Sequence, residues 1–406
     1  MNTKQIKGGV TAPLGFTASA IHCGIRKNKE KLDLALIKAE KPCAAAAVYT
    51  QNLVKGAPIA VTQRHIANGL AQAVICNSGI ANTCNADGEE KAVQMAELAA
   101  SALQIKAEDV IVASTGVIGM PLPIEPIASA LPALASALSI EGGHAAAQAI
   151  MTTDTKPKEL AIELEISGKP VRIGGIAKGS GMIHPNMATM LSFITTDAAI
   201  APAILQEALN EAVAVSFNMI SIDGDTSTND MVSILASGRA GNAEIAERNA
   251  DYDAFAQGLT LLCRQLSKEI AKDGEGATKL LICRTEGASD ESAAKQIAKA
   301  VICSSLVKTA MFGSDANWGR VLCAIGYAGV PCDISRIDLS FSSSAGSIEV
   351  CKNGAGIPFD EDTAKAILSQ EEIIIAISLN QGTGSAEAYG CDLTYEYVKI
   401  NGDYRT

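Results

Sequence analysis

Apolar and polar residues follow one another in short runs that predict strands separated by helices. In 160–166 the apolar residues are spaced two apart, with polar or small residues between them, which predicts a half-buried strand. Short apolar runs predict further strands at 46–50, 58–62, 72–76, 109–114, 231–236, 279–283, 336–341, 347–351, 373–378 and 391–400.

Two longer segments, 87–103 and 255–270, carry apolar side chains three or four residues apart, which is the spacing of one helix face. Strands that alternate with helices predict an α/β fold. The alternation within several strands favours mixed sheets over an all-parallel sheet, because strands of a parallel sheet are apolar on both faces.

Composition and charge narrow the classes of function. The chain has 406 residues, of which 48% are hydrophobic and 19% charged, as in an ordinary globular protein. The net charge of −11 disfavours a nucleic-acid partner, because phosphate backbones repel an acidic chain. The first residues lack the apolar core of a signal peptide, and no apolar run is long enough to span a membrane. We therefore expect a soluble, cytoplasmic protein without a membrane partner.

The eleven cysteines are odd in number, dispersed, and never spaced as CxxC. This argues against a disulfide framework and against a zinc site. We expect most of them to be buried free thiols that pack as small apolar side chains, and we expect no metal.

Two polar segments are candidates for chemistry. The stretch 167–191 holds five glycines around Lys178, but neither the phosphate-loop spacing nor the dinucleotide fingerprint is present. A nucleotide-binding loop therefore stays an alternative only. The stretch SIDGDTSTND at 221–230 is acidic, but it lacks the glycine and glutamate positions of a calcium-binding EF-hand loop, so a polar turn explains it better.

The dipeptide Ala188-Thr189 offers a different chemistry. A threonine hydroxyl is a weak nucleophile unless a base takes its proton. If the chain is cut before Thr189, the new α-amine lies on the same residue and can act as that base near neutral pH.

The segment KGSGMIHPNMATML at 178–191 resembles the signature of the ornithine acetyltransferase family, the ArgJ-type glutamate N-acetyltransferases of arginine biosynthesis. Companion motifs occur in order along the whole chain. They are ASTGVIG (113–119), MTTDT (151–155), SIDGDTSTND (221–230), DGEGATK (273–279), SDANWGR (314–320) and INGDYRT (400–406).

The resemblance implies autocatalytic cleavage between Ala188 and Thr189 into an α chain, 1–188, and a β chain, 189–406. It implies transfer of the acetyl group of N-acetylornithine to glutamate by a ping-pong mechanism, with Thr189 as the nucleophile. Some family members also use acetyl-CoA to make N-acetylglutamate and some do not; we take the bifunctional type as the expectation.

Residue roles follow from the same resemblance. Thr115 and Gly116 match the pair that stabilises the oxyanion. A threonine of MTTDT, Thr152 or Thr153, matches a substrate contact. The other matching substrate-binding positions are Lys178, Thr189, Glu275, Asn401 and Thr406.

The family's fold is a layered sandwich of mixed sheets between helices. It is similar in layering to N-terminal-nucleophile hydrolases but has the topology of the ornithine acetyltransferase and self-processing aminopeptidase group. The resemblance implies no cofactor, and it implies α and β chains associated as a heterotetramer or larger. The alternatives are a self-processing aminopeptidase of the same fold and a nucleotide-binding module built on the loop around Lys178.

Overall fold

The computed structural model describes residues 3–184 and 190–403. The chain folds into two compact units. The described residues of unit 1 fall within 1–179, 185–218 and 226–266, and those of unit 2 within 180–184, 219–225 and 267–406. The predicted chains 1–188 and 189–406 both contribute to both units, so the division at 188 is not a boundary between folding units.

Unit 1 is built on a nine-stranded mixed sheet. The order is β1-β6-β7-β8-β10-β3-β4-β5, with β2 paired to β3; β8 with β10 and β4 with β5 are the parallel pairs. The strands are β1 (Lys4–Ile6), β2 (Phe16–Ile21), β3 (Leu34–Tyr49), β4 (Leu70–Ile80), β5 (Val110–Val117), β6 (Lys158–Ile166), β7 (Lys169–Lys178), β8 (Leu191–Thr196) and β10 (Met231–Ala236).

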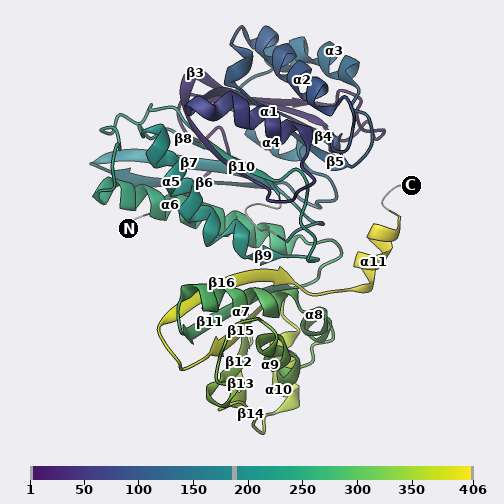
Figure 1. The fold of residues 1–406 in the computed structure, drawn as a ribbon, viewed down its shortest axis with the longest axis vertical. Coiled ribbons are helices and arrows are strands. Elements are labelled where there is room, and N and C mark those ends of the chain that lie inside the picture. Colours follow the sequence, from purple (N-terminus) through teal and green to yellow (C-terminus); the bar gives the residue numbers. More distant parts are fainter. Residues whose placement is uncertain (1–2, 185–189, 404–406) are drawn as a thin grey trace. The chain divides into compact units, whose positions relative to one another are not determined.

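The helices of unit 1 cover this sheet from two sides (Figure 1). They are α1 (Ala57–His65), α2 (Gly88–Leu103), α3 (Ile124–Ser136), α4 (Gly143–Ala149), α5 (Pro202–Ala214) and α6 (Ala250–Lys272), with short 3-10 turns η1 (Ile66–Asn68), η2 (Ala107–Asp109) and η3 (Phe217–Met219). The last residues of α6 and of η3 belong to unit 2.

Alternation along the strands of unit 1 creates two cores. On β3, β4 and β5, one set of side chains packs against α2 and α3. The other set packs against α4 and against side chains of β7 and β8, such as Ile176 and Phe193. Strands from both ends of the sheet therefore contribute side chains to this second core. On the far side of β7, Gly175 lies against Leu262 and Leu266 of α6. The predicted layering of helices around mixed sheets is therefore confirmed.

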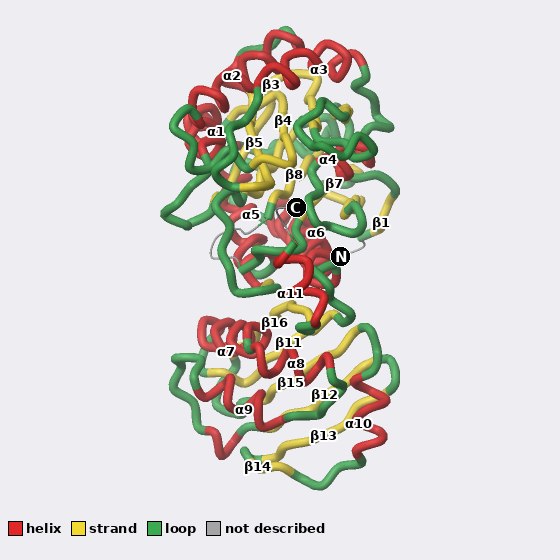
Figure 2. Tube along the Cα trace, turned by 90° about the vertical axis from the view of Figure 1, so that its right-hand side faces the viewer, coloured by secondary structure: helices red, strands yellow, loops and turns green. Residues whose placement is uncertain are grey.

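Unit 2 is a second mixed sheet, in the order β14-β13-β12-β15-β11-β16-β9, with helices packed along it (Figure 2). Its strands are β9 (Ile220–Ser221), β11 (Leu280–Ala288), β12 (Asp338–Ser343), β13 (Gly346–Lys352), β14 (Ala355–Gly356), β15 (Glu372–Ser378) and β16 (Gly384–Cys391). Its helical segments are α7 (Glu291–Cys303), α8 (Ser305–Phe312), α9 (Trp318–Gly326), η4 (Ile334–Arg336), α10 (Glu361–Leu368) and α11 (Tyr395–Gly402). Side chains of α7, α8, α9 and α10 form its core with one face of the sheet.

Two of the predicted strands are wrong. The run 58–62 belongs to helix α1, which starts with Pro58 in its first turn, a position where the missing N–H of proline costs nothing. The strand predicted at 391–400 is a helix over most of its length: β16 ends at Cys391, where the predicted strand begins, and residues 395–402 form α11. A strand here would bury one face against the rest of the sheet, but Tyr395 is 84% exposed, so the segment lacks that burial.

Three simpler expectations can be compared with the described residues. All eleven cysteines are free and most are buried or half-buried, although Cys84 and Cys323 are exposed. No group of three metal-binding side chains occurs in residues 3–184 and 190–403. In the same part of the chain, no helix has the length and apolar character needed to cross a membrane.

Candidate active site

The first element of the candidate site is the end of β5, where Thr115 and Gly116 lie opposite Ser78 and Gly79 of β4. Gly116 has φ +133°, and a Cβ atom there would lie 2.2 Å from the carbonyl carbon of Gly79. Only glycine allows the two backbones to approach this closely. Thr115 is 9% exposed, and its hydroxyl has no hydrogen-bond partner within the described part of the chain, so it is available as a donor.

A buried asparagine fixes the backbone just before Thr115. The Asn229 amide donates to the carbonyl oxygens of Ala81 (2.5 Å) and Ser114 (3.0 Å). Its Oδ1 atom accepts from the hydroxyls of Thr83 and Thr228, both at 2.6 Å. Because all of these bonds are buried, Asn229 ties the ends of β4 and β5 to the start of β10.

The second element is a charge cluster at the end of β7. Lys178 is the last residue of that strand and is 7% exposed. Asp154 Oδ1 accepts from Lys158 Nζ at 2.6 Å and from the Gly179 N–H at 2.7 Å, and its Oδ2 accepts from the Thr152 N–H at 2.9 Å. Burial alone would raise the pKa of Asp154, but the ammonium groups of Lys158 and Lys178 outweigh it and hold that pKa well below its usual range.

The pKa of Asp230 shifts in the opposite direction. Burial raises its pKa well above the ordinary value, and neither a hydrogen bond with Ser227 nor the charge of Lys178 reverses the effect. Its Oδ2 atom has no partner among the described residues. The next residue, Met231, donates its N–H to the carbonyl of Met190 at 3.0 Å, so Asp230 lies at the start of β8, where the described chain resumes.

Buried cations and carboxyl groups therefore gather at the end of β7. The charges of Lys158 and Lys178 act on Asp154, and the charge of Lys178 also acts on Asp230. The ammonium group of Lys178 is of the kind that binds an anionic group, such as a substrate carboxylate.

In unit 2, the structure brings together two of the residues that the resemblance assigns to substrate. Glu275 is 7% exposed, and its backbone N–H donates to the Ser180 carbonyl at 2.8 Å. Its Oε2 atom accepts from Asn401 Nδ2, in the last turn of α11, at 2.7 Å. Gly181 lies so close that a Cβ atom there would be 2.3 Å from the Glu275 Cδ atom.

The other assigned residues are placed as follows. Thr115, Gly116, Lys178, Thr152 and Thr153 belong to unit 1, and the two tandem threonines are both half-buried. Ala188, Thr189 and Thr406 lie outside the described residues.

Three side chains that organise the site in unit 1 were not identified individually from the sequence: Asp154, Asn229 and Asp230. All three belong to the motifs MTTDT and SIDGDTSTND. The positions of these acidic and amide residues within the motifs were the available signal.

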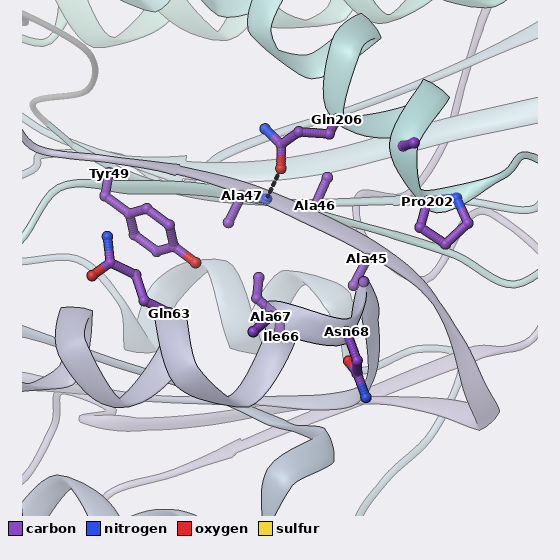
Figure 3. A pocket seen from close by; sticks show the side chains of 12 residues that line it. Ala45, Ala46, Ala47, Tyr49, Gln63, Ile66, Ala67, Asn68, Pro202 and Gln206 are labelled. Carbon is purple, nitrogen blue, oxygen red and sulfur yellow. Dashed lines mark hydrogen bonds between the residues drawn. The ribbon is translucent and has the colours of Figure 1, made fainter.

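A separate cavity of about 400 Å³ lies between α1, η1, β3 and α5 (Figure 3). Gln206 is one of its lining residues and accepts a hydrogen bond from the Ala47 N–H at 3.2 Å. Its lining residues are Ala45, Ala46, Ala47, Tyr49, Gln63, Ile66, Ala67, Asn68, Gly69, Pro202, Ala203 and Gln206. Only uncharged residues line it, so it lacks the cation that a carboxylate ligand would need, and the strand ends are the better candidate.

Comparison with known proteins agrees with the motifs. A sequence model described as the ArgJ family matches residues 17–406. The arginine biosynthesis bifunctional protein ArgJ of Symbiobacterium thermophilum is 54% identical over 403 residues, 99% of each chain. ArgJ 1 of Clostridium acetobutylicum is 51% identical over 392 residues, 96% of each chain. A crystal structure of the ArgJ protein of Bacillus halodurans has 45% identity and a TM-score of 0.51, covering 53% of this chain and 99% of that one. Matches of this extent show that the chain belongs to the ArgJ family.

Proposed function

We propose that this ArgJ-family enzyme of arginine biosynthesis transfers the acetyl group of N-acetylornithine to glutamate, through an acetyl ester on Thr189. The observation that carries the proposal is the end of β5, where Thr115 has an available hydroxyl on a backbone fixed by Asn229 and by the Gly79–Gly116 contact. Full-length similarity to bifunctional ArgJ proteins supports the substrate assignment.

The nucleophile is released by self-cleavage. Thr189 Oγ attacks the Ala188 carbonyl, an N-to-O acyl shift gives an ester, and water hydrolyses it to leave a free α-amine on Thr189. The solved Bacillus halodurans chain supports this division: it matches 53% of the 406 residues, about 215, close to the 218 residues from 189 to 406.

Acetyl transfer passes through two tetrahedral oxyanions, one when the ester forms and one when it is consumed. The Thr115 hydroxyl and the Gly116 N–H are suited to stabilise them, because donors fixed before the reaction need no reorganisation. In the first half-reaction the α-amine of Thr189 takes the proton of the attacking hydroxyl and gives it to the leaving amine of ornithine. In the second, it takes a proton from the attacking amine of glutamate and gives it to Thr189 Oγ as the ester breaks, which restores the hydroxyl.

Substrate recognition divides by charge. Both amino acids carry an α-carboxylate, for which the buried ammonium group of Lys178 is suited. The ammonium group of ornithine requires an acceptor, for which the Glu275 carboxylate is suited. Thr152 or Thr153, Asn401 and Thr406 complete the proposed substrate contacts.

We further propose the bifunctional type, in which acetyl-CoA also supplies the acetyl group, because the relatives in Symbiobacterium thermophilum and Clostridium acetobutylicum are named bifunctional. We also propose that the α and β chains remain associated after cleavage, as at least two αβ pairs. The mass of the native assembly would test this.

The decisive experiment is incubation with N-acetylornithine alone, followed by intact mass measurement. We expect one added acetyl group on the fragment that begins at Thr189, and parallel lines in double-reciprocal plots when both substrates vary. Converging lines without an acetylated fragment would indicate direct transfer in a ternary complex. Release of acetate to water as fast as transfer to glutamate would favour a hydrolase such as the self-processing aminopeptidase, and an uncut chain that binds ATP or NAD would favour the nucleotide-binding module.

A further inference from the structure

The connection from β2 to β3, residues 22–33, is fastened by one buried carboxylate. Asp33 is fully buried, and its Oδ1 atom accepts the Cys23 N–H at 2.6 Å. Its Oδ2 atom accepts the N–H groups of Gly24 at 3.2 Å and Arg26 at 2.9 Å. Because three backbone groups bond to one buried side chain, Asp33 sets the backbone position of Arg26.

The same aspartate joins this connection to the end of β4. The Ser78 N–H donates to the Asp33 carbonyl at 2.9 Å. The residue after Ser78 is Gly79, which lies opposite Gly116 of the proposed oxyanion pair. The backbone of Arg26 is therefore held next to the strand ends that carry that pair.

The stem of the Arg26 side chain lies against the backbone of Gly79. Gly79 has φ +104°, and a Cβ atom there would lie 3.0 Å from Arg26 Cγ and 3.7 Å from Arg26 Nε. A side chain at position 79 would therefore press on the arginine, and the positive φ would strain any residue but glycine. Glycine at this position leaves room for Arg26 as well as for the close approach of Gly116.

The guanidinium group at the end of this stem reaches a different segment. Its Nη2 atom donates to the carbonyl of Met151, the first residue of MTTDT. In the next residue, the Thr152 N–H donates to Asp154 Oδ2 at 2.9 Å. One side chain thus contacts both the strand ends of the proposed oxyanion pair and the turn that carries the proposed substrate threonine. An arginine suits this place, because its long stem packs along backbone while its planar head donates hydrogen bonds.

We propose that Arg26 is a positioning residue of the acetyl-transfer site, which holds the MTTDT turn in place beside the ends of β4 and β5. The inference rests on the proposed function, in which the end of β5 stabilises the oxyanion and Thr152 or Thr153 contacts substrate. Position 26 lies outside every motif that carries the family resemblance. Its role is to keep the bound substrate and the oxyanion donors in register, because a misplacement of about 1 Å can lower the rate about 10²-fold.

Three variants of the full chain test this role. Arg26→Met keeps an unbranched stem and removes the donors, and Arg26→Lys restores a positively charged donor on a stem of similar length. Lys27→Met is the matched control, because Lys27 is the next residue on the connection and is exposed. The Ser78 hydroxyl donates to the Ala149 carbonyl at 2.5 Å, which joins β4 to the end of α4 without Arg26, so we expect the variants to fold.

Hydrogen exchange of the peptide spanning 150–155 is the first measurement, since it does not depend on any activity. The Thr152 N–H lies within this peptide and loses protection when the turn loosens. We expect Arg26→Met to exchange about fivefold to tenfold faster than the wild type, the factor for one lost hydrogen bond, and Lys27→Met to match the wild type. Exchange of Arg26→Met at the wild-type rate would overturn the proposal, whatever reaction the enzyme catalyses.

Kinetics then separate a positioning role from a merely structural one. For Arg26→Met we expect kcat of acetyl transfer to fall by about 10-fold to 100-fold, with KM for N-acetylornithine within about threefold, and for Arg26→Lys a partial recovery of kcat. Self-cleavage should keep its wild-type rate in both variants, because it needs no bound substrate. Equal slowing of cleavage and transfer, or an unchanged kcat, would reduce Arg26 to a structural residue. If the wild type itself shows neither cleavage nor transfer, the proposed function fails, while the exchange result still decides whether Arg26 holds the turn.

Discussion

The two units hold their candidate residues in opposite ways. In unit 1, Thr115 and Lys178 stand at the ends of sheet strands, almost fully buried, on backbone held by Asn229 and Asp154. In unit 2, Glu275 lies on a loop, and Asn401 lies on an eight-residue helix with no buried residue. A sheet supports groups that must not move during the chemical step, whereas local hydrogen bonds suffice to place groups that recognise a substrate. Changes in unit 1 should therefore lower kcat or stability, and changes in unit 2 should mainly raise KM.

The largest effect is expected for Thr189→Ala, which removes the proposed nucleophile. We expect a single uncut chain and acetyl transfer at background level, because both cleavage and ester formation need the hydroxyl. Intact mass and a denaturing gel measure the first effect, and an ornithine release assay measures the second. Cleavage of the variant at the same bond would show that another group performs it.

Thr115→Ala tests unit 1 at the residue that we propose as the oxyanion donor. We expect kcat to fall by about 10²–10³ with little change in KM, because the donor acts on charge that appears only in the transition state. Thr115→Ser, which keeps the hydroxyl, is the control and should retain most of the activity. If kcat of the alanine variant equals that of the wild type, Thr115 is only the residue that ends a strand.

Asp154→Asn tests the charge cluster through stability. The amide keeps the shape but removes the negative charge that lies 2.6 Å from the buried ammonium group of Lys158, so we expect a loss of about 3–5 kcal/mol in the free energy of unfolding, measured by urea. Because the folded pKa of Asp154 lies below its unfolded value, its contribution is complete above about pH 5 and disappears as the pH falls below about 4. The difference between wild type and variant should narrow in acid; a difference that is constant with pH would contradict the assigned charge.

Prediction from sequence was most successful where information is local. The alternation in 160–166 and the apolar stripe in 255–270 correspond to β6 and α6, because the period of side chains alone decides which face is buried. The strand predicted at 391–400 was wrong because its stability depends on contacts that are not local. YEYVKI alternates like a strand, yet a strand needs a neighbour to cover it, and in unit 2 Asp392 accepts from the Thr278 and Lys279 N–H groups before the helix begins.

The site was predictable only as far as motifs name residues. Thr115, Lys178 and Glu275 come from segments that the family resemblance identifies, but the pKa shifts depend on the fold: burial raises the pKa of Asp230, whereas the charges of Lys158 and Lys178 lower that of Asp154. Lys178 and Asp154 are far apart in the sequence and meet only because β7 ends beside the MTTDT turn. The spacing of apolar and polar residues along the sequence does not show that Lys178 and Asp154 lie close together in space.

The smallest expected effect concerns unit 2, where Asn401→Ala removes one hydrogen bond from Glu275. We expect KM for N-acetylornithine to rise about tenfold while kcat stays within about twofold, because the lost bond orders a carboxylate that we propose binds substrate and does not act on the transition state. Self-cleavage needs no substrate and should proceed at the wild-type rate, as intact mass against time would show.

Two comparisons sharpen this last prediction. Lys399→Ala, on the same helix, removes only an exposed pair with Glu396 and should leave both constants unchanged. Removal of 401–406 should lower transfer at least about tenfold, again through KM, and raise hydrolysis of N-acetylornithine relative to transfer if the tail also keeps water from the acetyl ester. An Asn401→Ala enzyme with lower kcat and unchanged KM would place Asn401 with the rigid, transition-state groups of unit 1, and the division of labour between the two units would then be wrong.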